Sequence, residues 1–209
     1  KTLKHVKTCW VSDSRVEKKP WGSERIWAAL EGINGKILYL QAGHRNSLKY
    51  NTIKNEYPEL GGNYQVMHHT QFLKSLLDEG RLKVEGGKFK GKRITFHDPC
   101  YLGRANNEYE APRDLLRKLE VELVEMRKCK KNGLCCGAGG GQMFKEPEKG
   151  NKAVNILRTE QAIETQPEVI AAGCPFCNTM MTDGVKGKNK EGQIEVMDVA
   201  EMIADADDL

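Results

Sequence analysis

Five cysteines in three short turn segments constrain this chain more than any other feature of its sequence. All five lie close to proline or glycine: Cys100, Cys135, Cys136, Cys174 and Cys177. The chain has seven cysteines in 209 residues, and we expect no signal peptide, so a disulfide scaffold is the weaker interpretation. Clustered cysteines in a reducing compartment more often bind metals or carry redox chemistry.

Segments with strand character alternate with segments of helical spacing from about Asn51 onward. Short apolar and β-branched runs predict strands at residues 64–67, 93–96, 123–126, 169–172 and 194–197. Capped apolar repeats predict helices at residues 70–80, 112–119, 152–165, after Cys177 and at 198–206. Strands that alternate with helices favour an α/β fold, with a parallel sheet flanked by helices.

The cysteines fall where parallel sheets form their binding sites, at the carboxyl ends of strands. Cys100 follows the predicted strand 93–96, and Cys174 follows the strand 169–172. The adjacent pair Cys135–Cys136 lies further along the chain after the strand 123–126. We therefore expect the three segments to meet at one edge of the sheet.

The adjacent cysteine pair is the rarest part of this pattern. Neighbouring side chains of an extended segment point to opposite faces, so both sulfurs reach one site only across a sharp turn. Gly133 and Gly137 flank the pair and permit that turn. The backbone N–H groups of the following glycine run can approach sulfide and thiolate sulfur. We predict a cofactor-binding role for Gly137, Gly139 and Gly140.

Several interpretations of the five cysteines stay open. Five thiolates exceed the four ligands of a zinc ion or a cubane cluster, so either one thiol is spare or sulfurs bridge irons in an open cluster. A structural zinc site, a dithiol redox pair at Cys174 and Cys177, and cysteines that only pack in the core are the alternatives. Their positions beside proline and glycine favour an iron–sulfur cluster.

Four motifs together resemble a known family: HDPCYLGR (97–104), GLCCGAGGG (133–141), RTEQA (158–162) and CPFC (174–177). From about residue 51 to its end, the chain resembles the cysteine-rich CCG domain found in heterodisulfide reductases and their relatives. The resemblance implies an α/β domain that binds an iron–sulfur cluster. In heterodisulfide reductases it implies a non-cubane 4Fe-4S cluster that serves disulfide cleavage. In other relatives it implies an electron relay, and zinc has been considered for some.

Residues 1–50 depart from that family. Relatives usually carry two tandem cysteine-rich domains, whereas only Cys9 remains here of the closing motif of the first, and we interpret it as a bystander. The segments VEKKPWGSERIWA and GKILYLQAGHRNSLKY resemble a fragment of cupin-type sugar-phosphate isomerases. They predict a β-hairpin with strands at residues 35–39 and 47–50. We expect a β-rich segment at residues 1–50, by insertion, fusion or artefact, and the CCG domain at 51–209.

Other residues near the motifs have two interpretations each. His97 either fixes its turn or supplies a proton to a substrate thiolate, since histidine titrates near neutral pH. Arg104 either pairs with an anionic cluster, as we predict, or supports its loop. One of His68 and His69 is expected to be structural and the other to line the site. Cys129 lies outside the motifs and is expected to be a bystander.

Charge and hydropathy bound the partners. The net charge is +4 with both signs mixed along the chain, and the basic stretch 127–131 lacks the broad basic face of a nucleic-acid-binding protein. No apolar run reaches the roughly 18 residues of a membrane span. We expect a cytoplasmic protein, or one peripheral at the inner face of the membrane. The resemblance implies other oxidoreductase subunits as partners, either a flavoprotein or a membrane quinone-reactive subunit.

Three functions compete at this point. The chain relays single electrons, or reduces a disulfide by binding its sulfur at an open cluster, or serves assembly as a zinc module. One cluster and no flavin motif leave no second electron site in the chain. We therefore favour a component of an oxidoreductase complex over a stand-alone enzyme.

Overall fold

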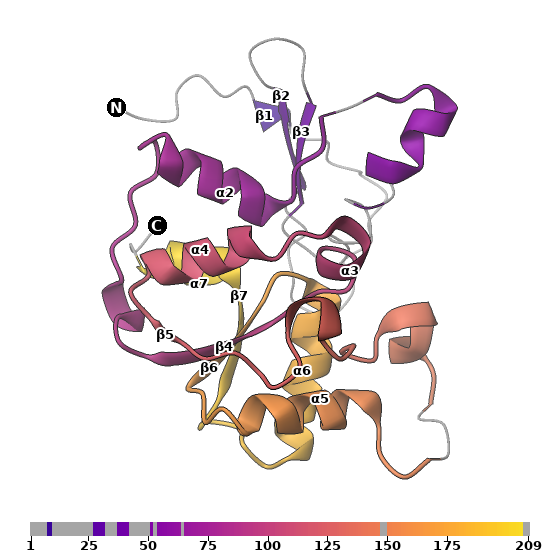
Figure 1. Ribbon diagram of the computed structural model, residues 1–209, viewed down its shortest axis with the longest axis vertical. Coiled ribbons are helices and arrows are strands. Elements are labelled where there is room, and N and C mark those ends of the chain that lie inside the picture. The colour runs from indigo at the N-terminus through magenta and orange to yellow at the C-terminus, as the bar shows by residue number, and fades with distance from the viewer. Residues whose placement is uncertain are drawn as a thin grey trace.

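A parallel sheet of four strands forms the centre of the described part of the computed structural model (Figure 1). Its strands lie in the order β5 (Glu122–Leu123), β4 (Arg93–His97), β6 (Val169–Ala172) and β7 (Glu195–Asp198). The two central strands are buried along almost their whole length, because helices cover both faces of the sheet. The predicted α/β fold with a parallel sheet is confirmed.

The structure describes the backbone of β1 (Thr8–Cys9), β2 (Trp27–Glu31) and β3 (Ile37–Gln41), and residues 51, 54–63, 65–146 and 150–206 in full. The first three strands form an antiparallel sheet in chain order. β3 overlaps the predicted strand at 35–39, whereas the predicted strand at 47–50 and its turn lie outside the described residues. A domain boundary at residue 50 stays a prediction.

Two groups of helices sandwich the parallel sheet (Figure 1). On one face lie α2 (His69–Asp78), α4 (Glu110–Lys118) and α7 (Val199–Ala206), which contact one another. On the other face, α5 (Val154–Ile163) packs against α6 (Pro175–Gly187). Shorter helical segments complete the described part, namely α3 (Gly103–Asn106) and 3-10 helices at Tyr57–Leu60, Gly87–Phe89, Lys130–Asn132 and Gly139–Phe144. None of the described helices is long and apolar enough to cross a membrane.

The side chains of β6 divide the core between the two faces. Val169 and Ala171 pack with Leu115 of α4 in one buried cluster. Ile170 points the other way and packs with Met181 of α6. This alternation follows from the two-residue period of a strand. It leaves the carboxyl ends of the strands free to carry polar loops.

A glycine sets the close approach of α5 and α6. A Cβ atom on Gly184 would lie 1.9 Å from the hydroxyl oxygen of Thr159, which no packing tolerates. The two helices therefore cross at a point where one of them has no side chain. Their closeness fixes the position of the N-terminal turn of α6, which carries Cys177.

The predicted elements differ from the observed ones at two places. Residues 65–67 of the predicted strand 64–67 form no strand, because the chain there runs into the capping turn of α2. The predicted strand 123–126 is shorter and starts earlier, as β5. The N–H of Val124 still donates to the carbonyl of Ile94 at 2.8 Å, but the chain then leaves the sheet edge and buries Met126 under α6.

Candidate metal centre

Two of the predicted ligand loops leave neighbouring strands at the same edge of the sheet. β4 ends at His97, which pairs in register with Ala172 at the end of β6. Cys100 lies on the loop after β4. Cys174 is the N-cap residue of α6, and Pro175 fills the first helical position, where proline is favoured. Cys177 then lies within the first turn of the helix.

The structure brings all five predicted cysteines together. Cys136, Cys174 and Cys177 are buried against one another, and Cys135 packs against them. Hydrogen bonds between side chains link Cys100 to Cys135, Cys135 to Cys136, Cys136 to Cys177, and Cys177 to Cys174. The five thiols thus form one continuous chain of contacts, the five-thiol site.

The protonation of the five-thiol site is uneven. Hydrogen bonds from the thiols of Cys100 and Cys136 hold the pKa of Cys135 far below its usual value. The same bond to Cys135, together with burial, raises the pKa of Cys100. Hydrogen bonds to Cys136 and Cys174 raise the pKa of Cys177 in the same way. The protein alone stabilises one thiolate, so binding a thiolate-ligated metal group would release the remaining protons.

The glycine turn after the cysteine pair faces the thiolate. The N–H of Gly137 donates to the sulfur of Cys135 at 3.3 Å, and the N–H of Gly139 also lowers the pKa of that thiol by a hydrogen bond. Gly137 has a φ of 93°, a conformation that favours glycine. Gly140, with a φ of 64°, would meet no atom within 4 Å if it carried a Cβ. The turn therefore offers open space beside its N–H donors.

A buried ion pair ties two ligand loops together. Both carboxylate oxygens of Asp98 accept hydrogen bonds from Arg113, at 2.7 and 3.0 Å. The backbone N–H of Lys130, on the loop that leads to the cysteine pair, donates to the same carboxylate at 2.7 Å. Arg113 also donates to Glu125 from Nε and Nη2. Asp98, which lies two residues before Cys100, thus fixes the first ligand loop to the second.

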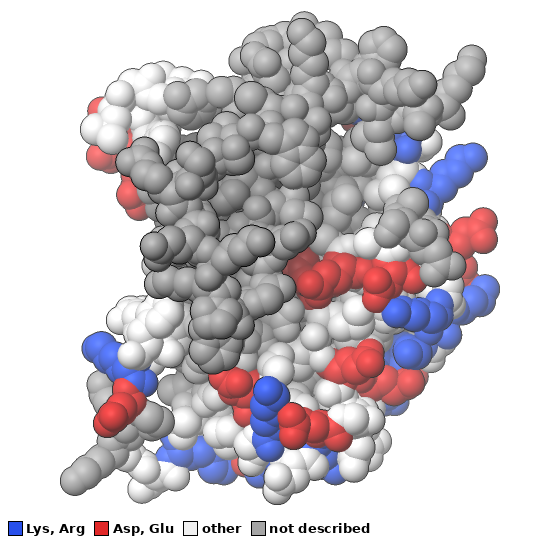
Figure 2. Space-filling model, turned by 180° about the vertical axis from the view of Figure 1, so that it is seen from behind, with Lys and Arg blue, Asp and Glu red and all other residues white. Residues whose placement is uncertain are grey.

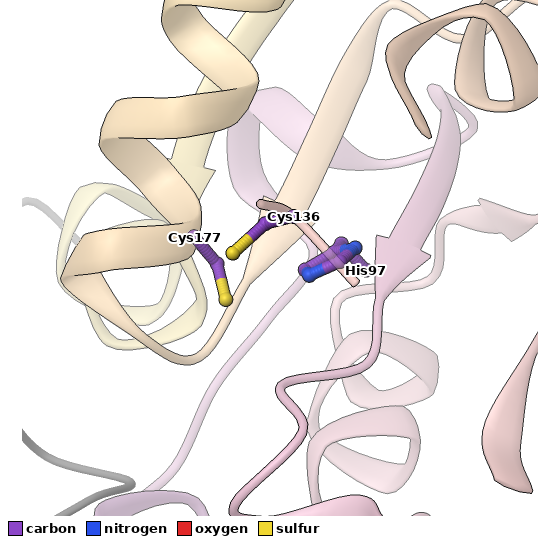
Figure 3. Close-up of side chains that lie close together, drawn as sticks. All are labelled: His97, Cys136 and Cys177. Carbon is purple, nitrogen blue, oxygen red and sulfur yellow. The ribbon is translucent and has the colours of Figure 1, made fainter. Parts of the chain in front are cut away.

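His97 lies inside the site rather than at its rim. Figure 3 shows its ring facing Cys136 and Cys177, and one ligand atom of each of the three residues lies within 4.8 Å of the others. Arg158 donates from Nε to Nδ1 of His97 at 2.9 Å, so Nε2 carries the proton of the neutral ring. Burial and the charge of Arg158 lower the pKa of His97 to about 3. In this arrangement His97 is a neutral hydrogen-bond donor.

Comparison with protein families gives one decisive match. The CCG cysteine-rich domain matches residues 94–182, a span that contains every cysteine of the five-thiol site. This part of the chain belongs to the CCG cysteine-rich family. The predicted resemblance is confirmed, and the matched CCG domain runs from β4 into α6.

Three relatives carry sequences similar to the CCG domain and its surroundings. A protein named probable iron-sulfur-binding oxidoreductase FadF, from Bacillus subtilis, is 47% identical over 74% of this chain and 22% of its own length. EtfAB:quinone oxidoreductase from Syntrophomonas wolfei is 44% identical over 74% of this chain and 22% of its own. One component of a dihydromethanophenazine:CoB–CoM heterodisulfide reductase from Methanosarcina barkeri is 35% identical over 82% and 40%. The chain therefore spans less than half the length of each.

Other predicted residues surround the CCG domain's thiols at different depths. Arg104 is exposed on α3, and its charge contributes to lowering the pKa of His97. Cys129 is half-buried, and burial and the charges of Glu125 and Asp98 raise its pKa. It takes no part in the chain of thiol contacts described above. Its position agrees with the expected bystander.

The paired histidines lie next to the CCG domain's ligand loops. Both are buried, and His68 caps α2 by accepting the N–H of Thr70 on Nδ1. The ring of His68 approaches Gly173, the residue before Cys174. His69 lies on the far side of the pair, with Nε2 3.4 Å from the carboxylate of Asp198. His68 is thus the histidine nearer to the site.

Sequence reasoning missed the buried arginines of the site. Arg113 and Arg158 are both fully buried, although charged residues on amphipathic helices are usually expected at the surface. The only signal for Arg158 was its place in the RTEQA motif. For Arg113 the signal was an aspartate next to the ligand loop that would need a partner once buried.

Proposed function

We propose that the five-thiol site binds an iron–sulfur cluster and that this chain is an electron-transfer component of an oxidoreductase complex. The convergence of five cysteine thiols from three loops carries the proposal. Cysteine thiolates are the usual ligands of iron–sulfur clusters. The relatives' names, an iron-sulfur-binding oxidoreductase and a quinone oxidoreductase among them, support the same chemistry. The proposed ligands are Cys100, Cys135, Cys136, Cys174 and Cys177.

The number of thiols bears on the kind of cluster. A cubane 4Fe-4S cluster takes four cysteine ligands, and a structural zinc ion takes four as well. A fifth thiol in direct contact with the others fits an open, non-cubane cluster in which sulfurs bridge irons. Such a cluster, when bound, gains and loses single electrons. Zinc held by four of the thiols is the alternative.

The protein's own groups prepare the site for an anionic sulfur centre. The N–H groups of Gly137 and Gly139 already donate to thiolate sulfur, and such donors tune the potential of a cluster. Asp98 holds the first ligand loop against the second. Buried walls, formed in part by Ala172 and Phe176, exclude water from the innermost thiols. These features suit rapid electron transfer without rearrangement of the ligands.

The partners that we propose are other subunits or domains of an oxidoreductase. The chain spans about a fifth of the two oxidoreductases named above, so electron donor and acceptor would lie in the remaining parts or in other proteins. Figure 2 shows acidic and basic side chains interspersed on the described surface seen from behind, many in ion pairs such as Arg117–Asp114 and Lys188–Glu160. Such a surface favours a protein partner over a nucleic acid.

The direction of electron flow is the finer part of the proposal. One relative is named for a quinone and one for a heterodisulfide. We favour relay between a flavoprotein and a quinone-reactive partner, since the relatives with the higher identity are the oxidoreductases. Quinones dissolve in the bilayer, so this relay would operate in the cytoplasm at the inner face of the membrane.

Metal analysis under anaerobic conditions tests the proposal. The protein is purified without oxygen, its iron, acid-labile sulfide and zinc are measured, and an EPR spectrum is recorded before and after reduction. We expect about four irons and four sulfides per chain, with a signal that reduction or oxidation changes. Zinc at one ion per chain without iron would support the assembly module instead.

A further inference from the structure

Arg158 is the most deeply buried cation beside the five-thiol site. It lies on α5 with no exposed surface. Nε donates to Nδ1 of His97 at 2.9 Å, and Nη1 donates to the carbonyl of Lys128 at 2.7 Å and to the amide oxygen of Gln161 at 3.0 Å. These bonds hold the guanidinium in one orientation. A side chain fixed on three sides in this way is positioned for the fourth.

The remaining donor of Arg158 has no partner among the described residues. Nη2 is buried and makes no hydrogen bond there. In a guanidinium, Nη2 lies on the same edge as Nε, and Nε points at His97. His97 in turn lies within 4.8 Å of the sulfurs of Cys136 and Cys177. The unpartnered N–H therefore lies on the side of the guanidinium that faces the thiols.

The charge of Arg158 also lacks the compensation given to the other buried arginine. Arg113 contacts two carboxylates, Asp98 and Glu125. Across the described residues, no carboxylate lies within ion-pair distance of Arg158. The nearest negative charges that act on it are those of Asp98 and of the thiolates, Cys177 and Cys136 among them. A guanidinium stays protonated in proteins, so a buried one without a carboxylate requires another anion nearby.

We propose that Arg158 is the counter-charge of the cluster, that its Nη2 donates a hydrogen bond to a cluster or ligand sulfur, and that it raises the reduction potential of the site. The inference rests on the proposed function, because it requires an anionic iron–sulfur group. Reduction adds negative charge, which a fixed cation and an N–H donor stabilise. Arg158 is a positioning residue as well, since it holds His97 in the neutral form that donates from Nε2.

Redox titration of charge variants tests the inference. Arg158→Gln removes the charge and Arg158→Lys keeps it, and each is titrated anaerobically while the EPR signal is followed. Arg127→Gln is the matched control, because Arg127 is an exposed arginine that pairs with Glu164 at the surface. We expect Arg158→Gln to lower the equilibrium constant for reduction by about tenfold or more, which is about 59 mV for one electron. Arg158→Lys should recover most of this change, and Arg127→Gln should show none.

A measurement on the wild-type protein covers the case in which the variants do not fold. Protein grown with arginine labelled with 15N at its Nη atoms is reduced, and pulsed EPR is used to detect 15N coupling to the cluster. Coupling that Arg104→Lys retains supports the hydrogen bond from Arg158. Absence of coupling, or an unchanged potential in Arg158→Gln, overturns the inference while iron and sulfide in the wild type still uphold the proposed function. Wild-type protein without iron overturns both.

Discussion

Asp98 and Arg113 form a buried bidentate pair, with Oδ1 to Nη1 at 2.7 Å and Oδ2 to Nη2 at 3.0 Å. Neither side chain is more than slightly exposed. The carboxylate also accepts the N–H of Lys130, so one ion pair connects β4, α4 and the loop that leads to the cysteine pair. The ligand loops are thus held by charge and hydrogen bonds before any metal group binds.

Removal of Arg113 tests this connection. Arg113→Met leaves the carboxylate of Asp98 buried without its partner, so we expect a loss of about 3–5 kcal/mol in the free energy of unfolding. Urea denaturation followed by circular dichroism measures the loss. Lys88→Met is the control, because the Lys88–Asp205 pair is exposed and should contribute less than about 1 kcal/mol. Equal losses in the two variants would contradict the structural role of Arg113.

Cysteine variants test the ligand set. Cys135→Ser and Cys136→Ser each remove a thiol that contacts at least one other thiol of the site, so we expect loss of iron from the purified protein. Cys129→Ser is the matched control, because Cys129 lies beside Asp98 and Glu125 and should keep the wild-type iron content. Iron, sulfide and visible absorption are compared for the three variants. A Cys129→Ser protein without iron would show that the ligand set is wrong.

The sequence predicted the parts of this site that depend on local pattern. The strands β4, β6 and β7 follow from short apolar runs, and the cysteines at their ends follow from turn residues beside them. Parallel strands then bring Cys100 and Cys174 to one edge without further information. The adjacent pair, Cys135 and Cys136, arrives by a longer loop, and its meeting with the others was an expectation that the geometry supports.

The residues that were missed depend on tertiary contacts. Arg113 and Arg158 lie on helices whose charged residues are usually solvated, and nothing in their local sequence indicates burial. The role of Asp98 becomes visible only when the loop at Lys130 packs against it. The predicted strand at 64–67 failed for a related reason, since its apolar residues serve the approach to α2 instead of a sheet. Periodicity reports which residues are apolar, not which polar groups meet.

Helix packing around Gly184 gives a prediction about stability. Gly184→Ala would place a methyl group 1.9 Å from the hydroxyl of Thr159, so we expect destabilisation by at least about 1–3 kcal/mol, despite the higher helix propensity of alanine. Gly187→Ala is the control in the same helix, because its Cβ would meet only the flexible end of Ile156, at 2.9 Å. Thermal unfolding of both variants is measured. Partial recovery in a Gly184→Ala/Thr159→Ala double variant would identify the clash.

The glycine turn gives a prediction about retention of the cluster. Both Gly137 and Gly141 have left-handed φ values, 93° and 73°, so alanine at either position costs about 1–2 kcal/mol in backbone strain. Only at Gly137 would the new methyl group also press on α5, 3.3 Å from the N–H nitrogen of Asn155, whereas Gly141 faces open space. The turn that aims N–H groups at Cys135 would therefore shift in Gly137→Ala alone.

Iron release to a chelator measures this difference. We expect Gly137→Ala to lose iron about tenfold faster than wild type, in the range found for residues that support metal ligands, and Gly141→Ala to stay near the wild-type rate. Both variants are compared at equal unfolding free energy, adjusted with a stabilising osmolyte, so that global stability does not decide the result. If the two variants release iron at the same rate, backbone strain alone governs retention, and the contact between Gly137 and Cys135 has no part in it.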